Sequence, residues 1–302
     1  MQTILGAGGA IGIPLAKELV RFSDKIRLVG RNPKKVNPSD ELFTADIIDY
    51  NQTLEAVKGS DIVYLVAGLK YDLKVWQTQW PLLMKNVIDA CKKHRAKLIF
   101  LDNVYMYGRV NGWMTEETPF NPCSRKGEIR ARIAQMLIDE YKTKNLEAAI
   151  VRSADFYGSN IRSSVFNILV IDKLKKGQSA NWLLKDNLKH SFTYNIDAAR
   201  AAALIGNTPS AFNQTWHLPT DKNALTGAEY IKLTAGILGA KPKYFVLKKW
   251  QLHLVGLFVS DIKESMEMLY QSEYEYLFDS TKFENYFNIK PTPYKEGLTA
   301  SA

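Results

Sequence analysis

Cysteine and histidine are scarce in this chain, which has two cysteines and four histidines in 302 residues. Two cysteines, Cys91 and Cys123, exclude the disulfide framework on which small secreted domains depend. His190 and His217 have no cysteine or carboxylate at the spacing of a metal site, so we assign no metal. No basic-then-apolar leader precedes the first expected strand, and we therefore expect the reducing cytoplasm as the location.

Long apolar runs are also missing. The most apolar late stretch, Leu252 to Val259, is too short to cross a membrane and contains His253, so the sequence predicts a core helix there. The net charge of +9 is compatible with nucleic acid binding. Because the lysines are scattered through helix-periodic stretches such as 173–176, they favour solvated helix faces over a binding stripe. We expect neither nucleic acid nor membrane as a partner.

The chain has enough hydrophobic residues to form a large core, since they make up 46% of the sequence. The length allows about two domains. Short β-branched runs alternate with helix-periodic stretches, which predicts an α/β fold with a parallel, doubly wound sheet of the Rossmann type. The expected strands are 3–5, 26–29, 42–45, 62–66, 98–101 and 148–151, and the expected helices are 13–20, 51–58, 75–94, 125–143, 164–176, 196–206, 226–239 and 261–270.

A glycine-rich turn, Gly6 to Gly12, joins the first expected strand to the first expected helix. Glycines at 6, 9 and 12 permit a tight turn, a close approach of the backbone to a pyrophosphate, and close helix–strand packing. The free N–H groups of the helix N-terminus favour phosphates. The turn, with Gly9, Ala10 and Ile11 inside it, therefore predicts a dinucleotide site. A purely structural glycine turn is the alternative.

The residues at the end of the second expected strand indicate whether NAD or NADP is the cofactor. NAD-specific sites usually carry an acidic residue there, whereas this chain has Arg31, and its nearest carboxylate, Asp24, precedes the strand. A guanidinium fits a 2′-phosphate, so NADP is favoured over NAD; an ordinary exposed arginine is the alternative. The other expected cofactor contacts are Asp46 and Ile47 at the adenine and the run Ala67-Gly68-Leu69 beneath the cofactor.

Beyond Arg152 the alternation loosens into loops, with strands expected around 192–194 and 215–218 and an aromatic-rich tail. We expect this part to cap the carboxyl ends of the strands, where open α/β sheets bind ligands. The predicted division is an NAD(P)-binding Rossmann domain at 1–155 and a substrate-binding region at 156–302, interleaved with the end of the sheet.

Further segments carry a family pattern, namely 61–68, 86–91, 104–108 and 152–158. With the glycine turn and Asp46, they resemble the extended and atypical short-chain dehydrogenase/reductase superfamily, in its NAD-dependent epimerase/dehydratase branch. The resemblance covers nearly the whole chain and is specific in its first 160 residues. Ser191 to Asp197 is similar to the segment that carries sugar-nucleotide contacts in the epimerases. We expect a small-molecule substrate and a monomer or homodimer.

The resemblance also implies a catalytic serine or threonine and a Tyr-x-x-x-Lys pair, in which the tyrosine is the acid/base. This chain has Asn103, Lys126 and Arg130 at those three positions, so the dyad is missing. The family's sugar-nucleotide arginine appears as His190, which weakens the case for a nucleotide-sugar substrate.

The segment from Lys126 to Arg130 resembles the isoflavone-reductase-like members, in which the lysine is the acid/base. Arg130 and desolvation at a nicotinamide are expected to disfavour the ammonium form of Lys126. Asn103 and Tyr105 complete the predicted catalytic set, as hydrogen-bond donors to a substrate carbonyl. The alternative for Lys126 is a contact with the cofactor ribose.

Two more tyrosines are candidate donors, Tyr107 and Tyr71. Tyr105 and Tyr107 occupy alternate positions, so one of them is expected in the core. Asp102 is expected to be a structural carboxylate at the strand end.

Two classes of function remain. The first is an NAD(P)-dependent oxidoreductase or epimerase/dehydratase-like enzyme acting on a small carbonyl or hydroxyl compound. The second is a non-catalytic, NADP-binding redox sensor or regulator, which the loss of the dyad permits. A ligand stacked on the nicotinamide beside Lys126 and Asn103 would favour the enzyme, whereas a pocket filled by Tyr71 or Trp113 would favour the sensor.

Overall fold

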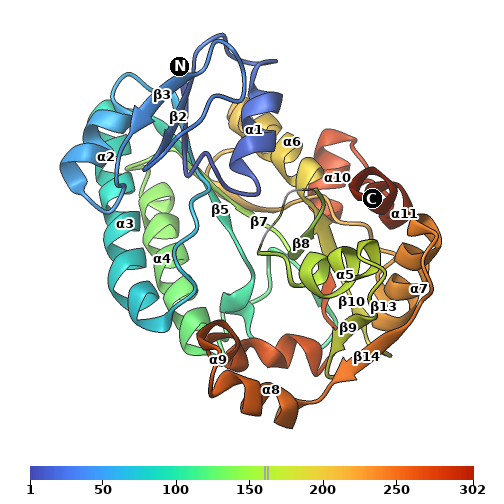
Figure 1. Cartoon of the computed structure of the whole chain (residues 1–302). Helices are drawn as coiled ribbons and strands as arrows, with labels where there is room; N and C mark the ends of the chain where they lie inside the picture. The colour runs from blue at the N-terminus through green and yellow to red at the C-terminus, as the bar shows by residue number, and fades with distance from the viewer. Residues whose placement is uncertain (160, 162) are drawn as a thin grey trace.

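The computed structural model describes residues 1–159, 161 and 163–302. Its centre is a seven-stranded sheet whose neighbouring strands all run parallel (Figure 1). The order of the strands across the sheet reverses its direction at the first strand of the chain. Open parallel sheets bind dinucleotides at such a reversal. Across the sheet the strands are β12 (Gln214–His217), β7 (Ala148–Arg152), β5 (Lys97–Asp102), β4 (Ile62–Leu65), β1 (Gln2–Leu5), β2 (Ile26–Gly30) and β3 (Glu41–Thr44).

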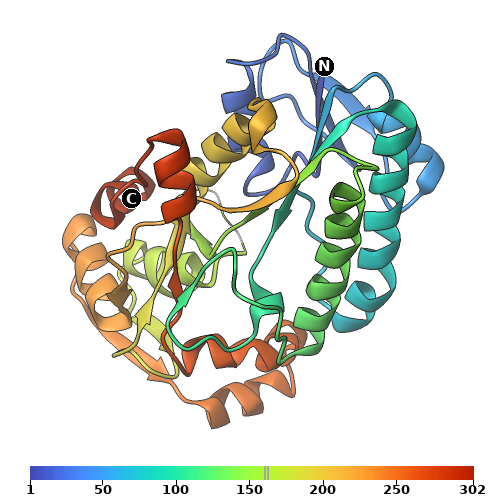
Figure 2. The same cartoon turned by 180° about the vertical axis from the view of Figure 1, so that it is seen from behind.

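Helices cover both faces of this sheet (Figures 1 and 2). One face packs against α1 (Gly12–Leu19), α6 (Asn195–Gly206) and α10 (Thr281–Phe287). The other face packs against α2 (Tyr50–Val57), α3 (Leu73–His94) and α4 (Arg125–Lys142). The predicted doubly wound Rossmann-type sheet is therefore confirmed.

The helices of the second face begin where the sequence supplies N-cap side chains. Asp49, Asp72 and Ser124 each accept a hydrogen bond from the backbone N–H three residues further on. Such caps satisfy one of the free N–H groups at a helix start. The caps of α3 and α4 fix both helix starts at the carboxyl edge of the sheet, and they place Lys126 in the first turn of α4.

The rest of the chain forms a smaller region over the carboxyl edge of the sheet (Figure 1). Its core is rich in aromatic rings, among them Tyr157, Trp182 and Tyr230. Its strands pair as β8 (Asp155–Tyr157) with β11 (Phe192–Tyr194), β9 (Ala180–Leu183) with β14 (Tyr244–Leu247), β10 (Lys189–His190) with β13 (Leu225–Thr226), and β6 (Trp113–Met114) with β15 (Leu277–Phe278). Its helices are α5 (Asp172–Lys175), α7 (Gly227–Leu238), α8 (Lys249–Gly256), α9 (Ser260–Ser265) and α11 (Tyr294–Ser301), with a π-helical turn at Asn167–Ile171 and a 3₁₀ segment at Met266–Ser272.

The prediction of a core helix at Leu252 to Val259 is confirmed for the helix as far as Gly256, but its burial is wrong. A helix, α8, does begin at Lys249, but it buries only Leu252 and Gly256. Leu257 is 75% exposed and Phe258 is 90% exposed, so this stretch is surface. Within the described ranges, no helix is long and apolar enough to span a bilayer.

Segments on both sides of residue 155 build the sheet layer. Strand β12 and helix α6 follow residue 155. Nevertheless β12 pairs with β7, and α6 packs against α1. The division into units 1–155 and 156–302 stays a prediction.

Candidate functional site

The turns that follow β1, β2, β4 and β5 meet at one edge of the sheet. The strand register sets Leu5 beside both Val29 and Leu65, and it sets Asp102 beside Arg152. Parallel strands end at a common edge, so the glycine turn, Arg31, the run Ala67-Gly68-Leu69 and Asn103 lie along the same edge of the sheet.

The three glycines of the turn have different surroundings. A β-carbon at Gly6, where φ is +95°, would lie 2.4 Å from Cα of Ala67, so only glycine lets the turns after β1 and β4 touch. A β-carbon at Gly12 would lie 2.6 Å from the carbonyl oxygen of Ala7. At Gly9, which is exposed, the nearest atom would be 3.4 Å away, so this position opens outward.

The start of α1 has no side-chain cap. Ile11, at the N-cap, makes no side-chain hydrogen bond to the helix. Uncapped N–H groups at a helix start favour anions. The side chain of Asn195, from α6, donates a hydrogen bond to the carbonyl of Ala10 at 3.2 Å and so braces the turn. This arrangement fits the pyrophosphate of a dinucleotide.

The residues expected at the adenosine end stand on exposed turns. Arg31 directly follows β2 and is exposed. Asp46 is exposed as well, and its carboxylate accepts a hydrogen bond from the Ile48 N–H at 3.1 Å, which shapes the turn after β3. Ile47 is half-buried and packs against the core of the second face.

Lys126 is buried, with 1% of its side chain exposed. Its ammonium donates to the carbonyl of Glu264 at 2.9 Å, to the Glu264 carboxylate at 2.7 Å and to the Glu267 carboxylate at 2.9 Å. It also lies 4.8 Å from the ring centre of Tyr71. All three ammonium donors are thus in use, and the lysine ties α4 to α9 and the 3₁₀ segment after it.

The two glutamates also bond the starts of both neighbouring helices. Glu264 accepts from the Leu73 N–H of α3, and Glu267 accepts from the Arg125 N–H of α4, each at 2.8 Å. Burial acts to raise the pKa of Glu264, but the hydrogen bonds from Lys126 and from the Leu73 N–H outweigh it and hold this pKa below its usual range. Through Glu264 and Glu267, the segment 260–272 is therefore held against the starts of α3 and α4 at the carboxyl edge of the sheet.

Arg130 does not face Lys126 in the way that the sequence predicts. Its guanidinium pairs with the buried carboxylate of Asp102, with Nε 2.7 Å from Oδ1, and lies over the ring of Trp80. Arg152 approaches the same carboxylate at 3.7 Å. The positive charge of Arg130 is thus neutralised in the core, and Asp102 has the structural environment expected for it.

Tyr107 is the core member of the tyrosine pair. Its hydroxyl accepts from Arg152 and contacts Nε2 of His217, each at 2.8 Å, and Nδ1 of His217 lies 2.8 Å from the carbonyl of Asp279. Burial, with a smaller opposing effect of Arg152, raises the pKa of Tyr107 to about 12. Burial and then Arg152 lower the pKa of His217 to about 3, so the ring is neutral.

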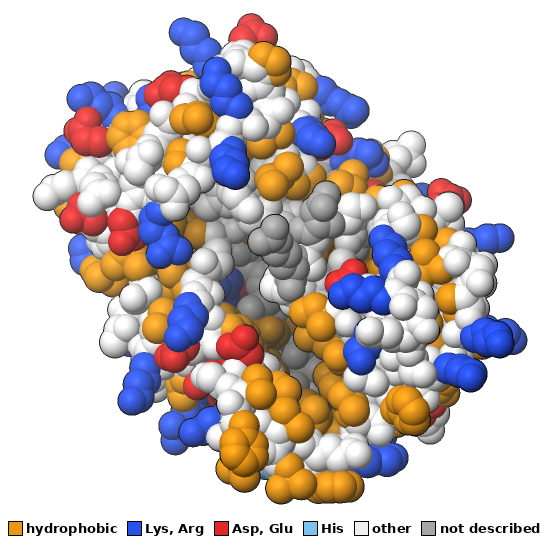
Figure 3. Space-filling view, in the orientation of Figure 1, with side chains coloured by type: hydrophobic (Ala, Val, Ile, Leu, Met, Phe, Trp, Pro, Cys, Tyr) orange, Lys and Arg blue, Asp and Glu red, His pale blue; other side chains and the backbone are white. Residues whose placement is uncertain are grey.

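Tyr105 and Tyr71 line a cavity of about 500 Å³ between the sheet edge and the C-terminal region. Figure 3 shows the surface hollowed there, with hydrophobic side chains along the hollow. Most of the lining is apolar or aromatic, including Val165, Ile168, Leu169, Trp182, Phe192, Met268 and Leu269. Burial raises the pKa of both tyrosines, so both phenols stay protonated. Asn103 holds the turn beneath them, because its side-chain oxygen accepts from the Tyr105 N–H at 3.1 Å.

One polar pair stands on the cavity wall. Asp155, from β8, and His190, from β10, lie 3.0 Å apart, from Oδ2 to Nε2. Lysine and arginine are missing from the cavity lining, as far as the described residues extend. Among the described residues, the cavity therefore offers two carboxylates, of Asp155 and Asp261, and the imidazole of His190.

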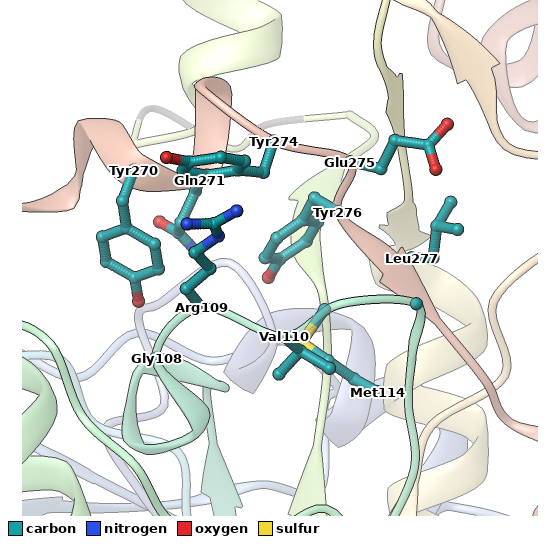
Figure 4. A pocket seen from close by; sticks show the side chains of 11 residues that line it. Gly108, Arg109, Val110, Met114, Tyr270, Gln271, Tyr274, Glu275, Tyr276 and Leu277 are labelled. Atoms are coloured by element: carbon teal, nitrogen blue, oxygen red, sulfur yellow. The ribbon is translucent and has the colours of Figure 1, made fainter.

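Tyr276 backs this pair, since its ring stacks on His190 at 4.3 Å. On its other side lies a pocket of only about 20 Å³, formed by residues 108–114 and 270–277 (Figure 4). Arg109 covers this pocket, with its guanidinium 3.4 Å from the ring centre of Tyr274. The space is enough for about one water molecule, so it is a packing feature rather than a second ligand site.

Sequence reasoning missed Asp155, Glu264 and Glu267 as site residues. Asp155 lies inside a recognised family segment, but nothing in the sequence shows that β8 turns its carboxylate toward His190. The two glutamates lie more than 130 positions from Lys126, and helix periodicity gives no indication of such a pairing.

The sequence model of one family, "NAD dependent epimerase/dehydratase family", matches residues 3–217. The chain belongs to this family. It is accordingly an NAD-dependent epimerase/dehydratase-like enzyme, as the resemblance in its sequence implied. No protein with a curated description matches it in sequence.

Solved structures similar to this chain have the same fold. UDP-glucose 4-epimerase of Thermus thermophilus, in complex with NAD, is 16% identical with a TM-score of 0.80, and the match covers 100% of this chain and 97% of that one. A dTDP-glucose 4,6-dehydratase of Streptomyces venezuelae with NAD bound is 15% identical with a TM-score of 0.81, covering 100% and 95%. UDP-N-acetylglucosamine 4-epimerase of Bacillus cereus is 15% identical with a TM-score of 0.77, covering 99% and 93%.

Proposed function

We propose that this enzyme reduces the carbonyl group of an apolar small molecule with NADPH, in the cavity beside Tyr105. The observation that carries the proposal is the position of this cavity. It is lined by Tyr105, which follows β5, and by Asp155, which follows β7, so it lies at the carboxyl edge of the sheet; its walls are largely apolar. Ligand sites in proteins combine such walls with a few polar groups.

Arg31 supports NADPH over NADH. It stands on an exposed turn after β2, where a 2′-phosphate would be paired with a guanidinium. Gly6, Gly9, Ala10, Ile11 and Gly12 hold the pyrophosphate in this proposal, with the run Ala67-Gly68-Leu69 beneath the cofactor. When bound, the nicotinamide supplies or accepts the hydride.

Tyr105 is the proposed hydrogen-bond donor to the substrate carbonyl. Its raised pKa keeps the phenol protonated, which suits a hydrogen bond that polarises the carbonyl, and the alkoxide formed by hydride addition then takes its proton from water. Tyr71 is a second donor on the same wall. Asn103 positions the turn that carries Tyr105.

Lys126 acts as a positioning residue in this proposal. Its three ammonium donors are occupied by Glu264 and Glu267. It therefore has no donor free for a substrate while these three hydrogen bonds are formed. It holds segment 260–272, which contributes Met268 and Leu269 to the cavity wall.

Asp155 and His190 point to a substrate without a diphosphate. A nucleotide sugar would bring two negative charges toward the Asp155 carboxylate. An uncharged compound with a hydroxyl group opposite Asp155 would instead gain a hydrogen bond.

A screen of aldehydes, ketones and alcohols, followed by NADPH absorbance, tests the proposal. Turnover should favour apolar ring or chain carbonyl compounds, and Ile168→Trp should abolish it by filling the cavity while NADPH still binds. Ile168 is 45% exposed, so the larger side chain should not unfold the protein. Turnover of nucleotide sugars alone would contradict the proposal.

A non-catalytic NADP-binding sensor is the second candidate, and the missing Tyr-x-x-x-Lys pair favours it. Two observations weigh against it. Tyr71 lines the cavity without filling it, and Trp113 is 42% exposed at the β6–β15 pair, away from the cavity.

A further inference from the structure

Exposed apolar side chains stand on β14, on α8 and on the loop that follows α8. The largest exposed fractions belong to Phe258 (90%), Leu257 (75%), Phe245 (67%), Trp250 (63%) and Leu254 (54%). Figure 3 shows hydrophobic side chains gathered at this lower edge of the molecule, where Figure 1 places α8 and α9. Large apolar patches of this kind mark interaction sites.

The charges beside this surface are mostly positive. Between residues 241 and 263 the chain has five lysines and a single acidic residue, Asp261. The lysines, at positions 241, 243, 248, 249 and 263, are all exposed. Lys249 is paired with Glu273, and the four other ammonium groups form no salt bridge with another described residue. The surface therefore combines protruding aromatic and leucine side chains with a positive border.

We propose that this α8 surface docks onto an anionic lipid bilayer. Trp, Phe and Leu side chains enter the boundary between headgroups and acyl chains, while lysines contact anionic headgroups. The helix lies on the membrane and does not cross it. A second copy of this chain fits the surface less well, because a twofold contact would bring the lysines of both copies together.

The α8 surface adjoins the cavity. Strand β14 leads into α8, and α8 packs against α9. Asp261 and Ser265 of α9 line the cavity. Docking would therefore bring the cavity mouth to the lipid surface and let an apolar substrate enter from the lipid phase; this second consequence rests on the proposed function, whereas docking itself does not.

Sedimentation with vesicles tests docking. Because this experiment uses neither cofactor nor substrate, its outcome does not depend on whether the activity screen finds turnover. The probes are phosphatidylcholine vesicles and vesicles of phosphatidylcholine with phosphatidylglycerol. The whole chain should sediment with the anionic vesicles, and its binding should fall with added salt.

Two variants and a control separate the contributions. Leu257→Ser/Phe258→Ser removes side chains that make few contacts in the fold, and it should weaken binding at least about tenfold. Lys241→Glu/Lys243→Glu should weaken it by a similar factor. Phe22→Ser, at a residue 42% exposed in the loop before β2, should bind like the wild type.

Three results would overturn the proposal. The first is no sedimentation with anionic vesicles. The second is equal binding by Leu257→Ser/Phe258→Ser and the wild type. The third is self-association of the wild type that the same double variant abolishes, without any binding to vesicles; in that case the surface is an interface between copies of the chain.

Discussion

Gly12 packs directly against the backbone of Ala7, and a β-carbon at Gly12 would lie 2.6 Å from the Ala7 carbonyl oxygen. Gly9, three residues earlier, faces outward, and a β-carbon there would have ordinary contacts. The same turn therefore contains one glycine required by the fold and another whose free side faces the proposed phosphates.

These two glycines give a matched pair of variants. Gly9→Val should abolish dinucleotide binding and leave the melting temperature of the free protein nearly unchanged, because the valine would occupy only the phosphate space. Gly12→Val should lower the melting temperature itself, because α1 must move away from β1. Circular dichroism and cofactor titration check both outcomes. Full cofactor affinity in Gly9→Val would mean that the glycines only shape the turn.

Arg31 should set the cofactor preference. We expect NADPH to bind at least about tenfold more tightly than NADH, since pairing with the 2′-phosphate is worth roughly 1 to 3 kcal/mol. Arg31→Asp should erase or reverse this difference. Lys34→Asp, an equal charge change at a nearby exposed position, should not. Calorimetric titration of both cofactors measures the ratio, and equal affinities in the wild type would remove the role assigned to Arg31.

The ion pairs of Lys126 with Glu264 and Glu267 should affect substrate binding more than cofactor binding. Lys126→Met leaves the Glu264 and Glu267 carboxylates without their ammonium partner, which should loosen segment 260–272 and raise KM while NADPH affinity stays within a few fold. Glu264→Gln/Glu267→Gln should raise KM similarly. If Lys126→Met instead depresses kcat by about 10² to 10⁴ and the glutamine variant does not, Lys126 is the acid/base. A severe loss of NADPH affinity would make it a ribose ligand.

His217 should make the folded state sensitive to acid. Burial and Arg152 lower its pKa from 6.5 to about 3, so the unfolded chain binds one more proton between these values. The free energy of unfolding should therefore fall as the pH drops below about 6.5, by at most about 1.4 kcal/mol per pH unit from this group. His217→Gln, which keeps a donor and an acceptor, should remove this contribution. Urea unfolding of both proteins at about pH 4 and pH 6 measures the difference, and identical pH dependence in both would exclude His217 as its source.

The sequence predicts the sheet and the glycine turn well because both depend on local pattern. Short β-branched runs place the six strands within a residue or two of β1 to β5 and β7. A β-carbon would collide with backbone atoms at Gly6 and Gly12 but not at Gly9, and the dinucleotide site itself stays a prediction. Such features are determined by neighbours in the chain, so a single sequence reveals them.

After residue 155, the strands expected around 192–194 and 215–218 and the helices expected at 196–206 and 226–239 match β11, β12, α6 and α7. The part of the chain after α7 is predicted poorly, because its structure depends on distant contacts. The apolar stretch after Leu252 is typical of a buried helix, and only the packing of α8 shows that Leu257 and Phe258 face outward. Lys126 is another example, since its partners Glu264 and Glu267 come from a segment far along the chain. The cytoplasmic location and the oligomeric state stay predictions.

The transfer of hydride within the cavity is the central claim, and NADPH deuterated at the transferring nicotinamide carbon tests it most directly. The enzyme should move deuterium to the carbonyl carbon of an apolar substrate found in the screen. Tyr105→Phe should lower the rate by about 10² to 10⁴ without loss of NADPH affinity, because the carbonyl loses its donor. Tight binding of NADPH with no deuterium in any product, across the whole set of carbonyl compounds, would contradict the claim and favour the sensor.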